Sequence, residues 1–213
     1  MIDVVLPVLD EAAALPWILQ RMPRGFRPIV VDNGSTDGSP RIARRCGADV
    51  FEEARRGFGA ACARGLAEAG ADVVCFMDCD GSLDPQELPR VVAPVIARQA
   101  DLVLGRRIAE RGAWPPHARA ANLLLARAIK RRCSIEITDL GPMRAARTDE
   151  LRALNIQDRR SGWPLEMVLR AAQAGWCVSE VPVPYLKRRG RSKITGTIRG
   201  TLTATRDMSR LLT

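Results

Sequence analysis

Two acidic residues, Asp78 and Asp80, stand one residue apart at the end of the apolar run over residues 71–77. A buried strand there would deliver both carboxylates into a turn that contains Gly81. Carboxylate oxygens are the ligands that hard divalent cations prefer, and such cations often carry phosphates. We therefore expect Asp78 and Asp80 to hold Mg²⁺ or Mn²⁺ in a phosphate-handling enzyme, although Asp and Gly are also ordinary turn residues.

The elements that must position this pair follow from the pattern of apolar residues. Short apolar runs alternate with helical patterns in the first half of the chain, which predicts parallel strands joined by crossover helices and an α/β fold class. There we expect strands over 3–8, 28–32, 48–52, 72–77 and 101–105, and helices over 12–21, 37–46, 58–69 and 85–98. In the second half we expect helices over 117–132 and 164–174, and strands over 141–146 and 176–186.

Ligand sites in such sheets lie beyond the carboxyl ends of the strands. The polar residues at or just past these predicted ends should therefore share one edge of the sheet. A carboxylate at Asp32 can accept hydrogen bonds from a base or ribose, and Gly34 allows close backbone approach, whereas Asp37 and Ser39 equally suit helix capping. The residues expected at this edge are Pro7, Asp10, Glu11, Asp32, Asn33, Asp78, Asp80, Arg106 and Arg107.

The composition and net charge of the chain limit which kinds of molecule it is expected to bind. The 213 residues, 46% hydrophobic and 27% charged, fit one globular domain, and the net charge of +9 with a pI near 10.1 implies anionic partners. Basic residues concentrate in 187–213, where Asp207 is the only acid. One Tyr and four Phe offer few base-stacking platforms, so we do not expect nucleic acid binding.

Features that the sequence lacks predict the cellular compartment of the protein. Six cysteines without a Cys-x-x-Cys pair favour a reducing cytoplasm, and residues 1–6 lack the pattern of a secretory signal. No apolar window is long enough to span a membrane, so we expect a cytoplasmic protein with at most peripheral contact to the inner face of the cell membrane. The apolar residues of 191–213 would supply that contact or fold onto the domain.

Three motifs together carry a family resemblance. Residues 6–11 (Leu-Pro-Val-Leu-Asp-Glu), 31–37 (Val-Asp-Asn-Gly-Ser-Thr-Asp) and 78–80 (Asp-Cys-Asp) resemble, in order and spacing, the motifs of family 2 glycosyltransferases with a GT-A fold. Later stretches are similar to the branch that contains dolichol-phosphate mannosyltransferases and other polyprenyl-phosphate glycosyltransferases. These stretches cover residues 101–107, 138–144, 180–185 and 190–193.

The resemblance implies a single GT-A domain over 1–190 with a Rossmann-like, mostly parallel sheet flanked by helices. A nucleotide-sugar-binding half over about 1–106 would precede an acceptor-binding half over about 107–190, and a basic segment would cover 191–213. The implied reaction is metal-dependent transfer of a hexose, with inversion, from a UDP- or GDP-sugar to an acceptor such as a polyprenyl or dolichyl phosphate. A hydroxyl acceptor remains an alternative.

Carried over by position, the resemblance assigns roles to individual residues. Asp78 and Asp80 would place the metal on the diphosphate, and Asp80 would serve catalysis in this way; Ser82 stands where relatives often have a Gln ligand. An anionic lipid phosphate needs only cations to hold it, whereas a hydroxyl acceptor would need a base, with Glu166 and Asp139 as candidates. The expected donor contacts are Pro7, Asp10, Glu11, Asp32, Asn33, Asp78, Arg191 and Lys193, and the expected acceptor contacts are Arg107, Arg119 and Arg144.

A second enzyme class fits the same carboxylates. Residues 76–82 also look like the nucleophile motif of haloacid dehalogenase-type phosphatases, in which Asp78 would attack phosphate and Asp80 would act as acid. That motif normally lies on the first strand of its domain, whereas three predicted strands precede it here. A sugar-1-phosphate nucleotidyltransferase would need a glycine-rich basic loop after the first strand, and residues 9–16 are acidic and apolar instead.

Overall fold

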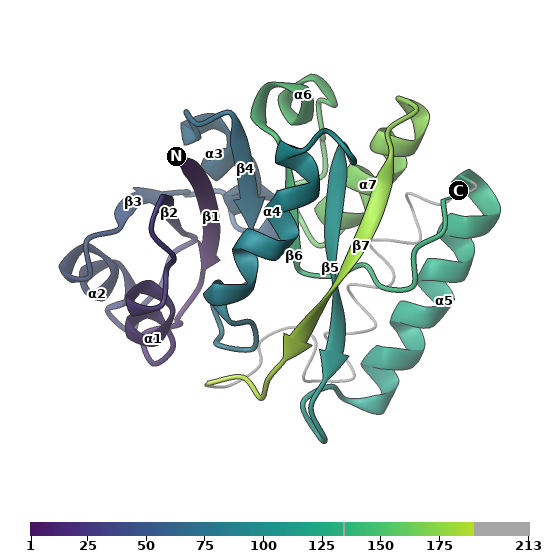
Figure 1. Ribbon diagram of the computed structural model, residues 1–213. Helices are drawn as coiled ribbons and strands as arrows, with labels where there is room; N and C mark the ends of the chain where they lie inside the picture. The colour runs from purple at the N-terminus through teal and green to yellow at the C-terminus, as the bar shows by residue number, and fades with distance from the viewer. Residues whose placement is uncertain (134, 190–213) are drawn as a thin grey trace.

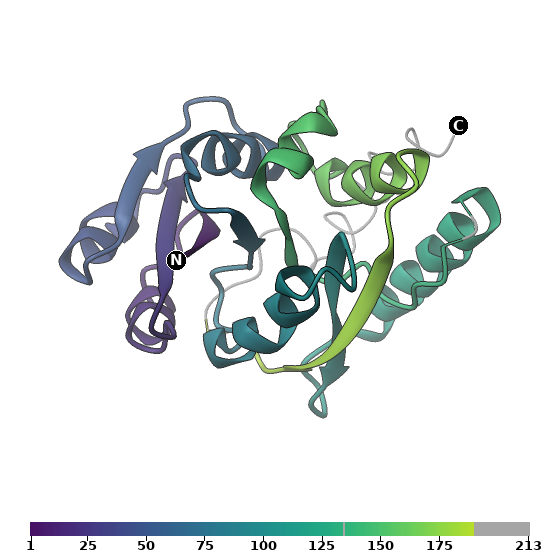
Figure 2. The same ribbon diagram turned by 45° about the horizontal axis from the view of Figure 1, so that its top comes forward.

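The computed structural model describes residues 1–133 and 135–189, which form a seven-stranded sheet flanked by helices on both faces (Figures 1 and 2). The strand order is β3-β2-β1-β4-β6-β5-β7, and β6 alone runs antiparallel to its neighbours. The strands are β1 Ile2–Val8, β2 Phe26–Asp32, β3 Asp49–Glu52, β4 Val73–Phe76, β5 Leu102–Ala109, β6 Met143–Arg147 and β7 Val178–Tyr185.

Helices connect the strands as crossovers, which the parallel pairing requires. They are α1 Leu15–Gln20, α2 Ser39–Arg45, α3 Phe58–Glu68, α4 Leu88–Ile96, α5 Pro116–Cys133, α6 Thr148–Ala153 and α7 Trp163–Gln173, and a 3₁₀ turn over Pro85–Glu87 leads into α4. Asp84 caps this turn by accepting the backbone N–H of Gln86 at 3.0 Å. None of the described helices is both long and apolar enough to cross a membrane.

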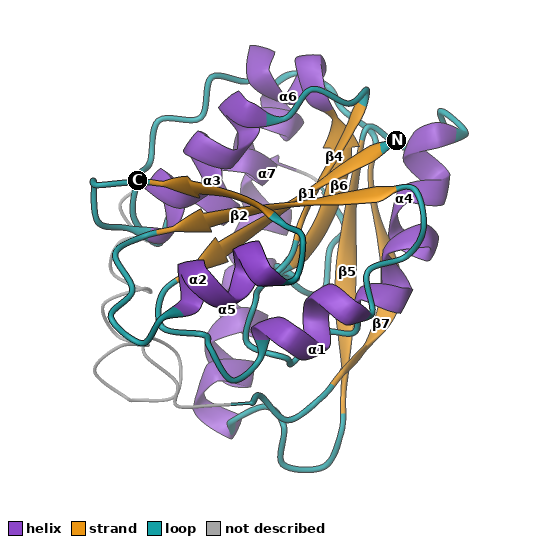
Figure 3. Ribbon diagram, turned by 90° about the vertical axis from the view of Figure 1, so that its left-hand side faces the viewer, coloured by secondary structure: helices purple, strands orange, loops and turns teal. Residues whose placement is uncertain are grey.

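Two hydrophobic cores sandwich the sheet. Val4 and Leu6 of β1 face a core completed by α1, α2 and α4, whereas Val5 faces the core formed with α3, α5, α6 and α7. Both faces of β1 are therefore buried, which explains why its residues 4–8 are a continuous apolar run rather than an alternating one. Figure 3 shows the strands edge-on between these two helical layers.

The predicted strands and the long predicted helices are all present, with ends shifted by a few residues. The short helix α6 was not predicted, because six residues directly after a strand show too little periodicity to be recognised. Pro182 and Pro184 interrupt the pattern of β7, but this strand ends the order of the described sheet, where a missing N–H donor costs little. The expected basic segment 191–213 lies outside the described residues.

Gly141 brings the loop before β6 into close contact with β5. A Cβ at this position would lie 2.0 Å from the carbonyl oxygen of Gly105, so no other residue fits without moving the backbone. This close approach places the preceding residues, Thr138 and Asp139, beside the carboxyl half of β5. The sequence Thr-Asp-Leu-Gly thus fixes the position of a polar loop at the edge of the sheet that also carries Asp78 and Asp80.

Candidate active site

Asp78 and Asp80 directly follow β4, at the carboxyl end of the central parallel strands. Asp80 is 9% exposed, and its Oδ1 accepts the backbone N–H of Ser82 at 2.9 Å, which closes the turn at Gly81. The segment after β7 lies against this turn, because Arg189 donates its N–H to the Asp80 carbonyl at 2.7 Å and Leu186 donates to the Ser82 carbonyl at 2.8 Å. Strand β7 therefore contributes its end to the carboxylate site.

The electrostatics of the pair suit a cation. Burial and the neighbouring Asp80 charge raise the pKa of Asp78 to about 7, against the lowering influence of Arg107, Arg144 and Arg188. Two carboxylates this close repel each other unless a positive charge lies beside them. Arg188 supplies one, since its Nη2 lies 3.1 Å from Glu11 Oε1 and 3.6 Å from Asp80 Oδ2.

The two carboxylates fit a hard divalent ion that would be held by few protein ligands. Within residues 1–133 and 135–189, no group of three or more His, Cys, Asp or Glu side chains is placed to share a metal. Asp78 and Asp80 would thus provide two carboxylates, leaving the other positions to phosphate oxygens and water, as Mg²⁺ commonly prefers. Ser82, which follows the pair, is fully buried.

The predicted nucleoside-binding carboxylates also shape their own loops. Asp32 accepts the backbone N–H groups of Gly34 and Ser35 at 3.1 Å, and Asp10, held at a positive φ of 51°, accepts that of Thr36 at 2.6 Å. Asp37 accepts the N–H of Ala12 at 2.9 Å. These contacts tie the loops after β1 and β2 together, whereas Pro7 lies within β1 beside Val31.

Asn33 joins the loop after β2 to the segment between β3 and α3. Its amide donates to the carbonyls of Glu53 at 2.9 Å and Arg55 at 2.8 Å, and its Oδ1 accepts the N–H of Gly57 at 2.8 Å. An Asp here would turn an oxygen toward two carbonyls. The observed contacts therefore suit an amide at this position rather than a carboxylate.

Arg56 is a site residue that sequence reasoning missed. Its Nη1 donates to the carbonyl of Asn33 at 2.6 Å, and its guanidinium covers Gly34 so closely that a Cβ there would lie 2.7 Å from the Arg56 Cζ. Gly34 has a φ of 87°, which glycine adopts without strain. The signal was the Arg55-Arg56-Gly57 run, which places a cation beside the loop after β2.

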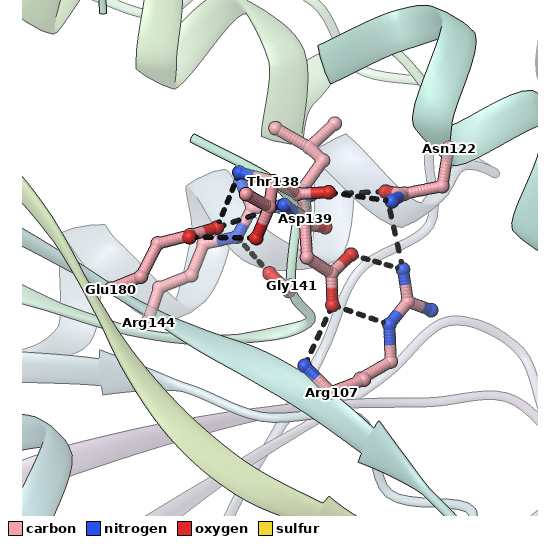
Figure 4. A network of polar contacts seen from close by, with 8 residues as sticks. Arg107, Asn122, Thr138, Asp139, Gly141, Arg144 and Glu180 are labelled. Carbon is pink, nitrogen blue, oxygen red and sulfur yellow. Dashed lines mark hydrogen bonds and ion pairs between the residues drawn. The ribbon is translucent and has the colours of Figure 1, made fainter. Parts of the chain in front are cut away.

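Arg107 and Asp139 form the centre of a second polar cluster, shown in Figure 4. The Arg107 guanidinium bonds both Asp139 oxygens, at 2.6 and 2.9 Å, and the Arg107 backbone N–H donates to the same carboxylate at 2.8 Å. Burial alone would lower the pKa of Arg107, but the bonds to Asp139 outweigh it and raise this pKa. The guanidinium also lies 3.8 Å from the ring centre of Trp114.

A cavity of about 240 Å³ opens beside this cluster. Cationic side chains line it from β5 and from the exposed face of α5, and the aromatic ring of Trp114 completes one wall. The cluster and the carboxylate pair interact electrostatically, since the Asp78 charge contributes to the raised pKa of Arg107. The lining of the cavity includes Arg106, Arg107, Trp114, Arg119, Leu123 and Asp139.

Two other predicted site residues serve the scaffold. Arg144 is 3% exposed and donates to the carbonyls of Leu140, Gly141 and Pro164; its burial lowers its pKa to about 10. Glu166 accepts the N–H groups of Gln157 and Asp158 and pairs with Arg170, and these contacts outweigh burial and lower its pKa. Arg191 and Lys193 lie outside the described residues.

A mostly parallel sheet with paired carboxylates just beyond a central strand is an arrangement in which α/β enzymes bind their ligands. The chain belongs to glycosyl transferase family 2, whose model matches residues 3–151. It is therefore a glycosyltransferase, and the alternative of a haloacid dehalogenase-type phosphatase is not favoured.

Several curated relatives match nearly the whole chain. An uncharacterized glycosyltransferase of Mycobacterium tuberculosis is 42% identical over 99% of this chain and 97% of its own length. The undecaprenyl-phosphate mannosyltransferase of Micrococcus luteus is 32% identical, covering 92% of this chain and 88% of its own. The dolichyl-phosphate hexose transferase of Haloferax volcanii is 31% identical, with coverages of 90% and 85%.

The solved structures confirm the GT-A fold. Glucosyl-3-phosphoglycerate synthase from Mycobacterium tuberculosis, in complex with Mn²⁺, UDP and phosphoglyceric acid, superposes with a TM-score of 0.79. The two chains are 22% identical, and the match covers 100% of this chain and 77% of the synthase. At this identity the likeness shows the fold alone.

Proposed function

We propose that the protein transfers a hexose from a nucleoside-diphosphate sugar to a polyprenyl or dolichyl phosphate, with inversion at the anomeric carbon. The relatives from Micrococcus luteus and Haloferax volcanii carry names of this reaction class and match about nine-tenths of the chain. The proposed donor is a UDP- or a GDP-sugar. The proposal rests most directly on the arginine-lined cavity, whose Arg107 interacts electrostatically with Asp78.

Asp78 and Asp80 are the residues proposed to hold Mg²⁺ or Mn²⁺, and the neighbouring synthase structures contain such ions together with UDP. When bound, the ion would offset the negative charge that develops on the departing diphosphate. Arg188 is a protein group able to do the same, because it already lies against Asp80 and Glu11. Arg191 and Lys193 are proposed to add positive charge on the same side.

On the acceptor side, the cavity presents a phosphate with fixed cations. Arg107 cannot swing away readily, because Asp139 holds its guanidinium by two bonds and Trp114 lies against it. Arg119 is exposed on α5 at the rim, where a phosphate can draw it inward. A phosphate is already an anionic nucleophile, so such a site needs positioning rather than a general base.

A hydroxyl acceptor would require a base, and the described geometry offers little support for one. Asp139 is 2% exposed with both oxygens bonded to Arg107, and Glu166 is fully engaged with backbone N–H groups and Arg170. A carboxylate whose pKa is lowered below its ordinary value is a weak base near neutral pH, which applies to Glu166. We therefore favour the phosphate acceptor and assign both carboxylates positioning roles.

A transfer assay tests the proposal. Purified protein is incubated with Mg²⁺, GDP-mannose or UDP-glucose, and undecaprenyl phosphate, and the lipid-linked hexose is detected by mass spectrometry. Wild type should form this product, and Arg119→Ala should raise the acceptor KM by about tenfold or more without changing donor affinity. Arg41→Ala, an exposed arginine on α2, is the matched control. Transfer to a hydroxyl compound but not to the lipid phosphate would contradict the proposal.

A further inference from the structure

Helix α5 presents an outward face that combines leucines with arginines. Leu123 and Leu124 are 46% and 67% exposed, which places them among the few large apolar side chains left in solvent by the described structure. Ala118, Ala126 and Ile129 bury the opposite side of the helix. Residues three and four apart share a helix face, so the exposed leucines lie among basic neighbours along one stripe. The exposed residues of this stripe are Arg119, Ala120, Leu123, Leu124, Arg127, Lys130 and Arg131.

The charge of this face is unbalanced. The sequence of α5 contains no acidic residue. Lys130 pairs with Glu136 at 2.6 Å, but Arg127 and Arg131 have no ion pair with any residue that the structure describes. Exposed leucines flanked by unpaired cations match a bilayer surface, where apolar side chains enter the acyl boundary and arginines contact anionic headgroups.

We propose that this face of α5 docks the protein onto an anionic lipid bilayer. The inference deepens the proposed function and rests on it in one respect, because a polyprenyl phosphate acceptor lies in a membrane. The position of the cavity supports the same orientation. Leu123 and Arg119 belong both to the exposed stripe and to the cavity lining, so the mouth of the cavity opens at the proposed membrane surface.

The leucines separate this surface from a nucleic-acid-binding one. Phosphate backbones are held by cations and polar groups, and they offer exposed leucines no apolar environment. A nucleic-acid surface would also need aromatic rings on which bases can stack. Trp114 does not offer one, because Arg107 covers its ring. A lipid surface accommodates both components of the stripe at once.

Vesicle sedimentation tests the docking surface directly. The full chain is mixed with vesicles of phosphatidylcholine alone, or of equal parts phosphatidylcholine and phosphatidylglycerol, and the bound fraction is measured at low and high salt. The test variants are Leu124→Ser and the double change Arg127→Glu with Arg131→Glu, which leave the cavity-lining Arg119 and Leu123 untouched. The matched controls are Ile96→Ser, 57% exposed on α4 at the other face of the sheet, and Arg41→Glu with Arg45→Glu on α2.

Wild type should bind the phosphatidylglycerol vesicles, and less so at high salt. The double charge reversal should weaken this binding by about tenfold or more, and Leu124→Ser by a few-fold, with unchanged thermal unfolding. Variants on α5 that bind like wild type, or control variants that weaken binding equally, would overturn the proposal. Binding of an oligonucleotide instead of vesicles, lost in the same α5 variants, would also overturn it.

A second readout separates this inference from the proposed function. With a short-chain, water-soluble polyprenyl phosphate as acceptor, the α5 variants should transfer hexose at the wild-type rate, whereas transfer to vesicle-embedded acceptor should fall with binding. If wild type binds vesicles through α5 but glycosylates neither acceptor, the docking surface stands and the proposed function fails. If both acceptors are glycosylated equally by wild type and the α5 variants, the docking proposal fails alone.

Discussion

Glu180 on β7 accepts the backbone N–H of Asp139 at 2.8 Å, across 41 residues of sequence. The same carboxylate accepts the N–H and the hydroxyl of Thr138, both at 2.8 Å. Since Asp139 in turn holds Arg107, the edge strand fixes the orientation of the cation that faces the proposed acceptor cavity. Glu180 therefore acts on the site through Asp139 rather than by touching a substrate.

Glu180→Ala should remove all three contacts, lower the free energy of unfolding by about 1–2 kcal/mol and raise the acceptor KM several-fold, because Arg107 loses its support. Glu180→Gln is the control, since one amide oxygen can keep both backbone N–H bonds and the amide N–H can donate to the Thr138 hydroxyl. Steady-state kinetics with varied acceptor check this expectation. Equal KM values for Glu180→Ala and wild type would show that the Arg107 position does not depend on this contact.

The amide of Asn33 leads to a stability prediction. Asn33→Asp replaces a donor to two carbonyls with an oxygen, so we expect the free energy of unfolding to fall by about 1–3 kcal/mol in urea denaturation. Asn155→Asp is the control, because Asn155 Oδ1 only accepts a bond from Gln157. An Asn33→Asp protein as stable as wild type would mean that the loop between β3 and α3 does not need this donor.

The lowered pKa of Asp3 leads us to expect that the free energy of unfolding depends on pH. This residue is fully buried on β1 and accepts Arg27 Nε at 2.7 Å together with the N–H groups of Gly70 and Ala71; these bonds outweigh burial and lower its pKa. A lowered folded-state pKa contributes stability above the unfolded value of about 3.9, and this is lost as pH falls through the folded value.

Asp3→Asn should therefore unfold more easily than wild type by about 1.5–3 kcal/mol at pH 7, and the difference should shrink below about pH 4. Urea denaturation at pH 7 and pH 3 measures it. A difference that stays constant between these pH values would contradict the assignment of the effect to the Asp3 charge. Asp49→Asn is a useful comparison, because this exposed partner of Arg27 lies 3.4 Å away and should matter less.

Glu166 distinguishes the two acceptor classes. If the acceptor is a phosphate, Glu166→Gln should reduce stability, because one of its oxygens can no longer accept an N–H, while the pH profile of kcat keeps its shape. If Glu166 were the general base for a hydroxyl acceptor, kcat would fall by about a hundredfold or more and lose its acidic limb. The kcat–pH profile of the variant, read beside its unfolding curve, separates these outcomes.

The sequence predicted most of the sheet because its strands are buried on both faces and appear as continuous apolar runs, as in Val4 to Leu6. It also predicted that Asp78, Asp80 and Arg107 share one edge, because parallel strands end together. The antiparallel direction of β6 was not predictable, since an apolar run carries no direction. The bond of Arg56 to Asn33 joins separate loops, and sequence spacing does not reveal such pairs.

We propose that Asp78 and Asp80 bind a nucleoside-diphosphate sugar through a divalent ion. Calorimetry with UDP, GDP, UDP-glucose and GDP-mannose, in Mg²⁺ or Mn²⁺ and then in EDTA, tests it most directly on wild type, Asp80→Asn and the exposed control Asp72→Asn. Asp80→Asn keeps an oxygen for the Ser82 N–H, so the turn should survive. We predict metal-dependent binding of one nucleotide class, retained in Asp72→Asn and weakened at least about tenfold in Asp80→Asn. Binding that persists in EDTA and in Asp80→Asn, or no binding by wild type, would contradict the account.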